Sequence, residues 1–553
     1  MGAIAKKYNA DYFNFKAQPL SSIHLYSNRR GELEPNGSIT YIYIMGTIAA
    51  FILAIACINF MNLSSAQASL RAKEVGMRKV AGAVRHQLVL QFLSESFILT
   101  AMAFVLAIVV AYASIPLLNN LMHKSVAINL FGNVKLLFAL VIIMVFVGLG
   151  SGLYPAFYLS AFKPISVLKG TQSSNSASLL LRKTLVIFQF TISIVLIIGT
   201  LTIINQLGFI QNKNLGFNKN ELVIIPLRSK EAIEQYQVLK NTIGENPSVV
   251  EVSGAAEYPG TEHPMYAHWA EGSINNIQLY DGAVGFDYFK VMQISLKDGR
   301  TFSENYPTDL AEAVVINEEA AKILGYTNNA IGKKIYNSAP DIKQRSWRTI
   351  VGVVKNYHSR SLREPIEPLF IIPHENCPNI IARIKSNDMP VTLSQLEVRF
   401  KEINPDLPFE AFFLDQNFAQ VYAAENRLTA IVKIFTGLAI FISCIGLLGL
   451  MSFTVDQRVK EIGVRKVLGA TATNIMLMLF SDTARYVLIA LLVATPISYY
   501  LMSRWLEGYA YRTTIGLSEF FIAGFALFGV AFLTIAFAVI KAAFSNPVKA
   551  LRS

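Results

Sequence analysis

One cationic motif occurs twice in this chain, and its repetition limits the folds that the chain can adopt. Arg71-Ala-Lys-Glu-Val-Gly-Met-Arg-Lys-Val-Ala-Gly-Ala83 returns as Arg458-Val-Lys-Glu-Ile-Gly-Val-Arg-Lys-Val-Leu-Gly-Ala470, with nine of thirteen positions identical. The offset of 387 residues holds without a gap from Cys57 and Cys444 to Glu95 and Asp482. Each copy directly follows a long apolar run. A repeated unit of span, basic turn and span predicts a membrane protein built from two equivalent halves.

The composition agrees with a membrane protein. Hydrophobic residues make up 53% of the chain, charged residues 16%, and the mean hydropathy is +0.41, whereas soluble proteins carry about 25% charge. The net charge of +12 does not indicate nucleic acid, because Lys and Arg cluster beside apolar runs and are not interleaved with aromatic residues. They indicate the positively charged flanks of spans that contact membrane lipid. Cys57, Cys377 and Cys444 cannot build a disulfide framework, since two of them lie inside apolar runs.

Seven uncharged stretches are long enough to cross a bilayer as helices, which takes about 20 residues. They group as three spans, one span, a polar stretch of about 220 residues that is large enough for one or two domains, and three more spans. The stretches are 37–70, 96–121, 136–162, 184–212, 434–455, 486–503 and 520–540.

The distribution of positive charge predicts the orientation. If the repeated motifs face the cytoplasm, so do a basic linker and a basic C-terminal tail, and the large polar stretch lies outside. The linker carries Lys163, Lys169, Arg182 and Lys183, and the tail carries Lys541, Lys549 and Arg552. Seven spans then place the N-terminus outside, yet residues 1–36 contain no apolar signal segment. We therefore expect that the chain lacks a preceding span and most of a first external domain.

The polar stretch predicts a domain of mixed α and β structure, which would recognise a ligand or brace the spans. Five segments have the β-branched or aromatic composition of strands: 221–226, 313–317, 349–354, 380–384 and 409–414. Helical patterns occupy 318–324, 391–403 and 416–433, and we expect the last to run straight into the next span. Loops are expected at 257–264 and 328–341.

Each copy of the motif predicts a charged helix. Glu74 precedes Arg78 by four residues, as Glu461 precedes Arg465, which is the favourable order for an ion pair on a solvated helix. A single such copy would be interpreted as a topology anchor. Its duplication favours a mechanical role, because orienting a chain requires positive charge and not this order of residues.

Helix-stop signals follow each copy. Gly82 and Gly469 predict helix ends, and Thr471 or Thr473 can cap the helix that leads into the next span. A short charged helix held between two spans moves only with those spans. We interpret the motif as a docking lever.

These features resemble the FtsX-like, or MacB-type, permease subunits of ABC transporters. The cytoplasmic turn of that family reads close to Glu-Ile-Gly-Val-Arg-Lys-Val-Leu-Gly-Ala, which residues 461–470 and 74–83 match. Short Pro-containing tails like those of the family's modules lie at 163–169 and 546–552, and segments 287–294, 313–321 and 351–358 look like its periplasmic domain. The resemblance covers nearly the whole chain and is closest to the long two-module permeases of the Bacteroidetes type, which begin with an extra span and a first periplasmic domain.

The resemblance implies an α-helical polytopic protein of the bacterial inner membrane, with about seven transmembrane helices in two FtsX-like modules and an extracytoplasmic α+β domain of the MacB periplasmic core type. The expected order is a remnant of a first periplasmic domain (1–36), a first three-span module (37–170), a cytoplasmic linker (171–183), a single transmembrane helix (184–205), the periplasmic α+β domain (206–427) and a second three-span module (428–553).

The resemblance also implies mechanotransmission. A separate cytoplasmic ATPase dimer binds ATP and Mg²⁺ and grips both turns, and the spans carry its motion to periplasmic substrate export or release. The chain itself is then no enzyme and holds no cofactor, in keeping with its lack of a Gly-x-x-x-x-Gly-Lys-Ser/Thr pattern. A membrane-fusion protein or another periplasmic protein is a further candidate partner. The ATPase-contacting positions carried over from the family are Arg71, Lys73, Glu74, Gly76, Arg78 and Lys79, with Arg458, Lys460, Glu461, Gly463, Arg465 and Lys466.

Three other patterns are interpreted as structural. Gly148 and Gly152 lie within a span at the spacing that lets helices pack closely, with no Lys placed to bind phosphate. Glu95 and Asp482 occupy equivalent positions near the ends of spans, where pairing with Arg is favoured over a proton relay. His263 and His268 in one segment are a weak metal signal, so no metal site is expected.

Two other functions stay open from the sequence. Some members of the family move no substrate and use the same lever to activate a periplasmic cell-wall hydrolase. A membrane-bound binding or scaffold module without an ATPase is the other alternative. The substrate is not readable from the residues.

Overall fold

The computed structural model describes residues 18–27, 37, 39–122, 127–130, 132–160, 176–337, 346–385, 388–458, 461, 464–465 and 468–543. Within these ranges, seven helices are long and apolar enough to span a membrane. They are α3 (Ile39–Val80), α4 (Arg85–Met122), α5 (Val134–Ser160), α7 (Ser176–Asn212), α15 (Ala423–Gln457), α17 (Ala472–Leu506) and α18 (Leu517–Ala543). The predicted fold class, with about seven spans and an α+β domain, is confirmed.

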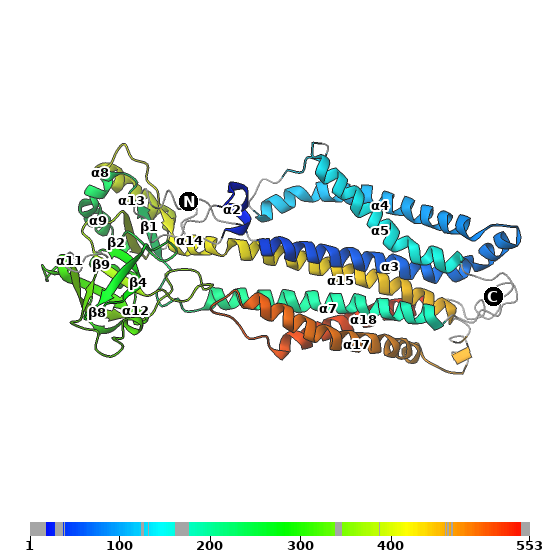
Figure 1. The fold of residues 1–553 in the computed structure, drawn as a ribbon. Coiled ribbons are helices and arrows are strands. Elements are labelled where there is room, and N and C mark those ends of the chain that lie inside the picture. Colours follow the sequence, from blue (N-terminus) through cyan, green and yellow to red (C-terminus); the bar gives the residue numbers. More distant parts are fainter. Residues whose placement is uncertain are drawn as a thin grey trace.

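The molecule is elongated (Figure 1). A domain built on a β-sheet, called here the sheet domain (residues 213–422), lies at one end of the helical bundle. The end of α3 that carries the first basic motif and the end of α15 that the second motif follows lie at the other. At 1.5 Å per residue, the 42 residues of α3 span about 60 Å. The helices therefore connect two functional ends that are far apart.

The two repeats meet where α3 and α15 run side by side (Figure 1). Asn59 donates a hydrogen bond from Nδ2 to the carbonyl of Ile442 at 2.7 Å. A Cβ at Gly446 would collide with Oδ1 of Asn59, and Gly446 is the residue that the 387-residue offset pairs with Asn59. A residue that touches its own repeat counterpart lies near a pseudo-two-fold axis. The helix crossing thus marks the axis that relates the two modules.

Helix α7 packs against the second module. Its buried apolar side chains form one cluster with those of α15, α17 and α18. Two hydroxyl pairs link it to α15, Ser193 with Ser443 at 2.9 Å and Thr200 with Thr436 at 2.7 Å. Hydrogen bonds between spans add to packing in a membrane, where apolar burial alone does not draw helices together. Helix α7 thus completes a four-helix bundle with the second module, whereas in the first module α5 packs on α3 and α4 packs on α5.

The sheet domain contains an eleven-stranded sheet that partly closes on itself. Strands β4, β3, β7, β8, β6 and β9 form a ring that the parallel β4–β9 pairing closes, with β5 added to β8. Strands β2, β10, β1 and β11 continue outward from β4. The strand bounds are β1 (Leu222–Pro226), β2 (Val249–Ala255), β3 (Met265–Ala270), β4 (Asn276–Val284), β5 (Leu296–Gly299), β6 (Ala313–Asn317), β7 (Lys334–Tyr336), β8 (Trp347–Val354), β9 (Leu369–Pro373), β10 (Asn379–Ile384) and β11 (Phe412–Phe413).

Short helices cover both parts of the sheet. Helices α9 and α13 pack on the outer strands over one apolar core, and α12 completes the core of the ring. The remaining helices of the domain connect strands or lie at its ends, and α2 precedes the first span. The bounds are α2 (Leu20–Tyr26), α8 (Lys230–Glu234), α9 (Tyr236–Gly244), α10 (Tyr288–Met292), α11 (Asp309–Glu312), α12 (Glu318–Ile323), α13 (Met389–Ile403) and α14 (Leu414–Val421).

The strands predicted at 221–226, 313–317, 349–354 and 380–384 are confirmed as β1, β6, β8 and β10, and the helices at 318–324 and 391–403 as α12 and α13. Three details were wrong. The strand at 409–414 is reduced to two residues, because α14 begins at Leu414. The predicted loop at 328–341 contains β7, and residues 338–341 lie outside the described residues. The helix expected to run from 416 into the next span breaks at Tyr422.

The break between α14 and α15 at Tyr422 coincides with a hydrogen bond to the sheet domain. The backbone amide of Leu362 donates to the Tyr422 hydroxyl at 2.9 Å, so the residue between α14 and α15 joins the sheet domain to the root of a span. Other expectations concern residues that the structure does not describe. These are 1–17 and 28–36 of the predicted N-terminal remnant, and the tails and linker at 161–175 and 544–553.

Substituting Gly446 by Ala should destabilise the junction of the two modules, because the new methyl group meets Asn59. We expect the free energy of unfolding to fall by about 1–3 kcal/mol, the usual cost of overpacking, as measured by thermal unfolding in nanodiscs. A Cβ at Gly437 on the same helix would have nothing within 4 Å, so Gly437→Ala is the matched control and should not lower stability. Equal effects of the two substitutions would contradict the close crossing.

Candidate functional site: the two basic turns

The first basic turn (residues 71–83) ends α3 through a glycine cap. Gly82 has φ +97°, a conformation that favours glycine. The amide of Gly82 donates to the carbonyl of Lys79 at 3.1 Å, and that of Ala83 to the carbonyl of Arg78 at 3.0 Å. These are the two bonds of a Schellman cap. The chain therefore reverses sharply between α3 and α4 while its charged residues stay on the last helical turn.

The second basic turn (residues 458–470) repeats this geometry. Gly469 has φ +93°, and the amide of Ala470 donates to the carbonyl of Arg465 at 2.9 Å. Thr471 then caps α17 by accepting a hydrogen bond from the amide of Asn474. The predicted helix ends and the predicted Thr471 cap are confirmed. The first turn has Val84 at the position of Thr471, and there the side chain of Gln87 accepts from the amide of Val84 at 3.3 Å instead.

The predicted ion pairs form in both turns. Arg78 lies 2.7 Å from Glu74, and Arg465 lies 2.9 Å from Glu461. All four side chains are between 44% and 51% exposed. Exposed pairs of this kind contribute at most about 1 kcal/mol to stability. They cost little to rearrange, so the guanidinium groups are available to another acidic partner.

Each guanidinium is also held by the helix that follows. Arg78 donates to Oε1 of Gln91 at 2.7 Å, and Arg465 donates to Sδ of Met478, the residue that the repeat pairs with Gln91. The same bridge between two helices thus occurs in both modules with different acceptors. The sequence does not single out Gln91 or Met478, because neither belongs to the repeated motif.

The first turn is tied to the third helix of its module. Lys79 donates from Nζ to the carbonyl of Ser160, the last residue of α5, at 2.7 Å. Partial burial and the nearby Arg85 lower the pKa of Lys79 below its usual value. Gly76 is buried. Lys79 and Gly76 therefore face the module, whereas Glu74 and Arg78 face outward.

The structure does not fully describe five of the predicted ATPase-contacting residues. The helix is described at Arg71 and Lys73 but not their side chains, and Lys460, Gly463 and Lys466 lie outside the described residues. Arg458 is placed, and it lies 3.7 Å from Asp482. The repeat counterpart of Asp482, Glu95, accepts a hydrogen bond from Gln91 at 3.2 Å.

Gly148 and Gly152 lie where α5 meets α4. A Cβ at Gly148 would lie 3.0 Å from the ring of Phe97, and one at Gly152 would lie 2.8 Å from Cβ of Ser96. Both contacts are tighter than ordinary van der Waals packing. The two glycines therefore set the distance between these helices.

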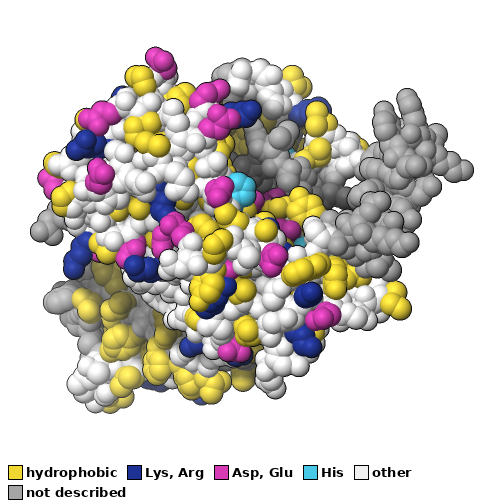
Figure 2. Space-filling view, turned by 90° about the vertical axis from the view of Figure 1, so that its left-hand side faces the viewer, with side chains coloured by type: hydrophobic (Ala, Val, Ile, Leu, Met, Phe, Trp, Pro, Cys, Tyr) yellow, Lys and Arg dark blue, Asp and Glu magenta, His cyan; other side chains and the backbone are white. Residues whose placement is uncertain are grey.

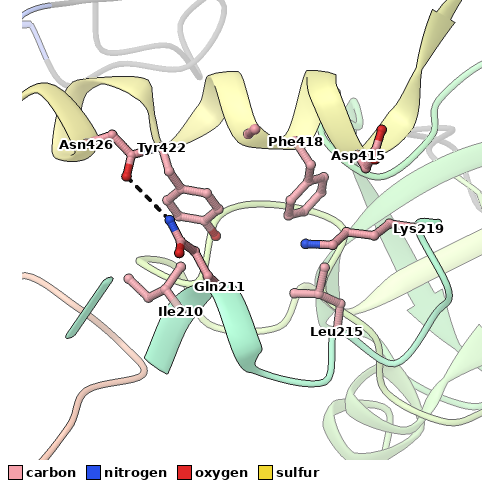
Figure 3. A pocket seen from close by; sticks show the side chains of 9 residues that line it. Ile210, Gln211, Leu215, Lys219, Asp415, Phe418, Tyr422 and Asn426 are labelled. Atoms are coloured by element: carbon pink, nitrogen blue, oxygen red, sulfur yellow. Dashed lines mark hydrogen bonds between the residues drawn. The ribbon is translucent and has the colours of Figure 1, made fainter. Parts of the chain in front are cut away.

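A small pocket of about 140 Å³ lies at the root of the sheet domain, between the end of α7 and α14 (Figure 3). Phe418 and Tyr422 form one wall, and Gln211 bonds across its edge to Asn426 at 3.4 Å. Ligand sites for drug-sized molecules occupy about 300–1,000 Å³. The pocket is therefore a gap in a joint between elements and not a site of that size.

The far surface of the sheet domain carries mixed charge (Figure 2). Acidic and basic side chains alternate there with single hydrophobic ones, and no broad area of one sign lies among the described residues of this face. The two histidines are held separately: His268 bonds to Asp281 at 2.8 Å, and His263 lies 3.8 Å from Glu367. A group of three or more His, Cys, Asp or Glu able to hold a metal ion does not occur in the part of the chain that is described.

Removing the threonine cap of α17 and adding a threonine cap to α4 should have opposite effects on the stability of the two helix starts. Thr471→Val removes the cap of α17, which costs about 1 kcal/mol, so the Asn474 amide should exchange its hydrogen about fivefold faster. Val84→Thr should slow exchange at the start of α4 because it supplies the cap that is missing there. Hydrogen exchange read by mass spectrometry checks both, and each variant is the control for the other turn. Unchanged exchange at Asn474 in Thr471→Val would contradict the cap.

The buried His263 should make the sheet domain less stable in acid. Burial, aided by Arg360, lowers the pKa of His263 to about 4, so the folded domain binds fewer protons than the unfolded chain between pH 6.5 and 4. Stability is then present above pH 6.5 and falls as the pH decreases toward 4, by about 2 kcal/mol between pH 7.5 and 5. Urea unfolding of the full chain should show a weaker pH dependence in His263→Gln. The same substitution at the exposed His374 is the control, and an equal effect of both would refute the assignment.

Comparison with known proteins agrees with the repeat and with the domain between its copies. Residues 46–164 and 433–547 match the family described as FtsX-like permease C-terminal, and residues 185–403 match the MacB-like periplasmic core domain. Among curated relatives, the macrolide export ATP-binding/permease protein MacB of Aggregatibacter actinomycetemcomitans is 27% identical over 37% of this chain and 32% of its own length. The uncharacterized ABC transporter permease YknZ of Bacillus subtilis is 23% identical over 38% of this chain and 54% of its own length.

The chain thus spans about a third to a half of these relatives. Two solved structures match part of the chain. The periplasmic region of MacB from Actinobacillus actinomycetemcomitans has 15% sequence identity, covers 37% of this chain and 94% of its own, and gives a TM-score of 0.28. The extracellular domain of YknZ has 14% identity, covers 34% and 97%, and gives a TM-score of 0.26.

The family matches fall on the two modules and on the sheet domain, in the order that the repeat requires. The chain belongs to the FtsX-like permease family of ABC transporters, in a form that carries a MacB-like periplasmic core domain between its two permease repeats.

Proposed function

We propose that this chain is the membrane permease subunit of an ABC transporter, and that it couples ATP hydrolysis by a separate cytoplasmic ATPase dimer to export or release of a substrate on the periplasmic side. The observation that carries the proposal is the pair of basic turns. The first presents an exposed Glu-Arg pair at the end of α3 and the second presents one just beyond the end of α15, and these long helices extend toward the sheet domain (Figure 1). A push on the turns is therefore transmitted along the helices.

The charge of the turns suits an acidic docking surface. Arg78 and Arg465 are partly exposed and held by weak ion pairs that a stronger partner can replace. Arg binds carboxylates through two parallel hydrogen bonds, which fixes orientation as well as position. Two equivalent turns on one chain match two equivalent halves of an ATPase dimer. Arg71, Lys73, Arg458, Lys460 and Lys466 add positive charge to the same segments.

The name of one relative supports a coupling to ATP. The macrolide export relative is named as an ATP-binding/permease protein, and this chain lacks a phosphate-binding loop pattern. In the proposed assembly the ATPase binds ATP and Mg²⁺, the basic turns and the C-terminus lie in the cytoplasm, and the sheet domain lies in the periplasm of a bacterial inner membrane. A membrane-fusion protein or another periplasmic protein is the proposed partner of the sheet domain. We further propose the domain boundaries given above as functional units.

Reversing the charge of both turns should weaken docking strongly. We expect the double variant Arg78→Glu, Arg465→Glu, in nanodiscs, to bind its cognate ABC ATPase at least tenfold more weakly, since each Arg at such an interface contributes more than about 1 kcal/mol. Surface plasmon resonance measures the affinity. Each single variant should lose less, because the other turn still engages its half of the dimer.

Arg399 provides a matched control. It forms an exposed pair with Glu402 at 3.2 Å on α13 of the sheet domain, so Arg399→Glu changes the same charge at the opposite end of the molecule. It should bind the ATPase as the unmodified chain does. Full affinity of the double turn variant would refute the docking role of the turns.

A further inference from the structure

A single arginine of the sheet domain contacts both permease modules. Arg363 lies in the loop between β8 and β9. It donates to the hydroxyl of Tyr41 at the start of α3 and, at 3.1 Å, to the hydroxyl of Tyr509 just after α17. It also lies 2.8 Å from the carboxylate of Glu425 at the start of α15. Three elements that are distant in sequence thus converge on one guanidinium group.

The contact is only partly sheltered from solvent, because the Arg363 side chain is 36% exposed. The Glu425 side chain is 6% exposed, and the guanidinium carbon lies 4.9 Å from the ring centre of Tyr509 and 5.8 Å from that of Tyr41. Burial alone would lower the pKa of Arg363, but Glu425 and the tyrosines outweigh it and raise the pKa. The guanidinium therefore stays charged. A buried carboxylate whose charged partner is removed is strongly destabilised, so Glu425 restrains Arg363.

The backbone fixes this loop to the second module. The carbonyl of Arg363 accepts from the amide of Ala510 at 3.0 Å, and that of Leu362 accepts from the amide of Tyr511 at 3.3 Å. Both donors belong to the connection between α17 and α18. Main-chain bonds in two successive residues hold more firmly than one side-chain contact. The Tyr41 bond is instead a side-chain contact with the first module.

We propose that Arg363 is the positioning residue through which the sheet domain responds to the relative motion of the two modules. This inference rests on the proposed function and names its coupling contact. The loop that pairs with Ala510 and Tyr511 fixes the sheet domain to the second module. The Tyr41–Arg363 bond transmits movement of the first module to the sheet domain. Guanidinium has five donors in a fixed fork, whereas an ammonium group is a point charge. Lys at position 363 can pair with Glu425 but cannot hold both tyrosines in this geometry.

The chain offers a matched control three residues earlier. Arg360 forms ion pairs with Glu262 at 3.0 Å, Glu364 at 2.9 Å and Glu367 at 3.8 Å. All three partners belong to the sheet domain, so Arg360→Ala removes a charge network of similar size without touching a span. If Arg363 only stabilised the sheet domain, Arg363→Ala and Arg360→Ala would have similar effects. Only Arg363 should affect the connection between domain and modules.

The first test uses the full chain alone, in nanodiscs, with Cys57, Cys377 and Cys444 replaced by Ala. Spin labels are placed at exposed positions: Val134 at the start of α5, Leu517 at the start of α18, and Ile274 in the sheet domain, which are 77%, 76% and 90% exposed. Electron–electron resonance should show a broader Val134–Ile274 distance distribution in Tyr41→Phe and Arg363→Ala. The Leu517–Ile274 distribution should stay narrow in Tyr41→Phe, and Arg360→Ala should leave both unchanged. Unchanged Val134–Ile274 widths in both Tyr41→Phe and Arg363→Ala would overturn the proposal.

The second test adds the ATPase with ATP and vanadate. In the unmodified chain both the Val134–Leu517 and the Leu517–Ile274 distances should change. In Arg363→Ala and Arg363→Lys the first should still change, and the second should lose most of its response. A full Leu517–Ile274 response in Arg363→Ala would overturn the coupling role. If the unmodified chain shows no nucleotide-dependent Val134–Leu517 change, the proposed function fails, and the connection itself is still judged by the first test.

Discussion

The packing of α3 against α15 is the contact on which the rest of the structure depends. It lies between two copies of one sequence unit, and Asn59 in one copy faces Gly446, its counterpart in the other. The side chain that fills the crossing comes from one repeat and the space that receives it from the other. Two large side chains at equivalent positions would compete for the same space where duplicated helices cross at their axis. The two copies differ here, since one has Asn59 and the other has Gly446.

The two modules are therefore related but not equal. Helix α7 completes a four-helix bundle with the second module, and hydroxyl pairs attach it to α15. The same module carries the main-chain pairing that holds the sheet-domain loop. In the first module α5 packs on α3 and α4 packs on α5, and this module meets the Arg363 side chain through Tyr41. The structure consists of one module whose backbone holds the sheet-domain loop and one that meets the same loop through a side chain.

Much of this fold could be predicted from local sequence patterns. Uninterrupted apolar runs predicted the spans, because a helix in lipid satisfies its own backbone, and glycine after a charged helical turn predicted both caps. Four buried strands were found because their β-branched runs lie between breakers. Strands β2, β3, β4, β5 and β7 were missed, because polar residues such as His268 and Asp281 interrupt their apolar pattern and find partners only across the sheet. Strand β9 was also missed, although Leu369–Pro373 is a short apolar run. Gln91, Met478 and Arg363 were missed because their roles depend on residues brought near by folding. The break at Tyr422 likewise depends on a bond to Leu362 that no local pattern encodes.

Helix α3 has a further consequence for how such a chain can change during evolution. It contains no proline and carries Tyr41 near one end and Arg78 near the other. An inserted or deleted residue anywhere between them would turn one end against the other by about 100° and shift it by about 1.5 Å. Tyr41 would then point away from Arg363 whenever Arg78 kept its place. The number of residues in α3 thus fixes the angle between its two ends, and this agrees with the gapless alignment of the repeats from Cys57 to Glu95. Substitutions along the helix are easier to accommodate than insertions or deletions.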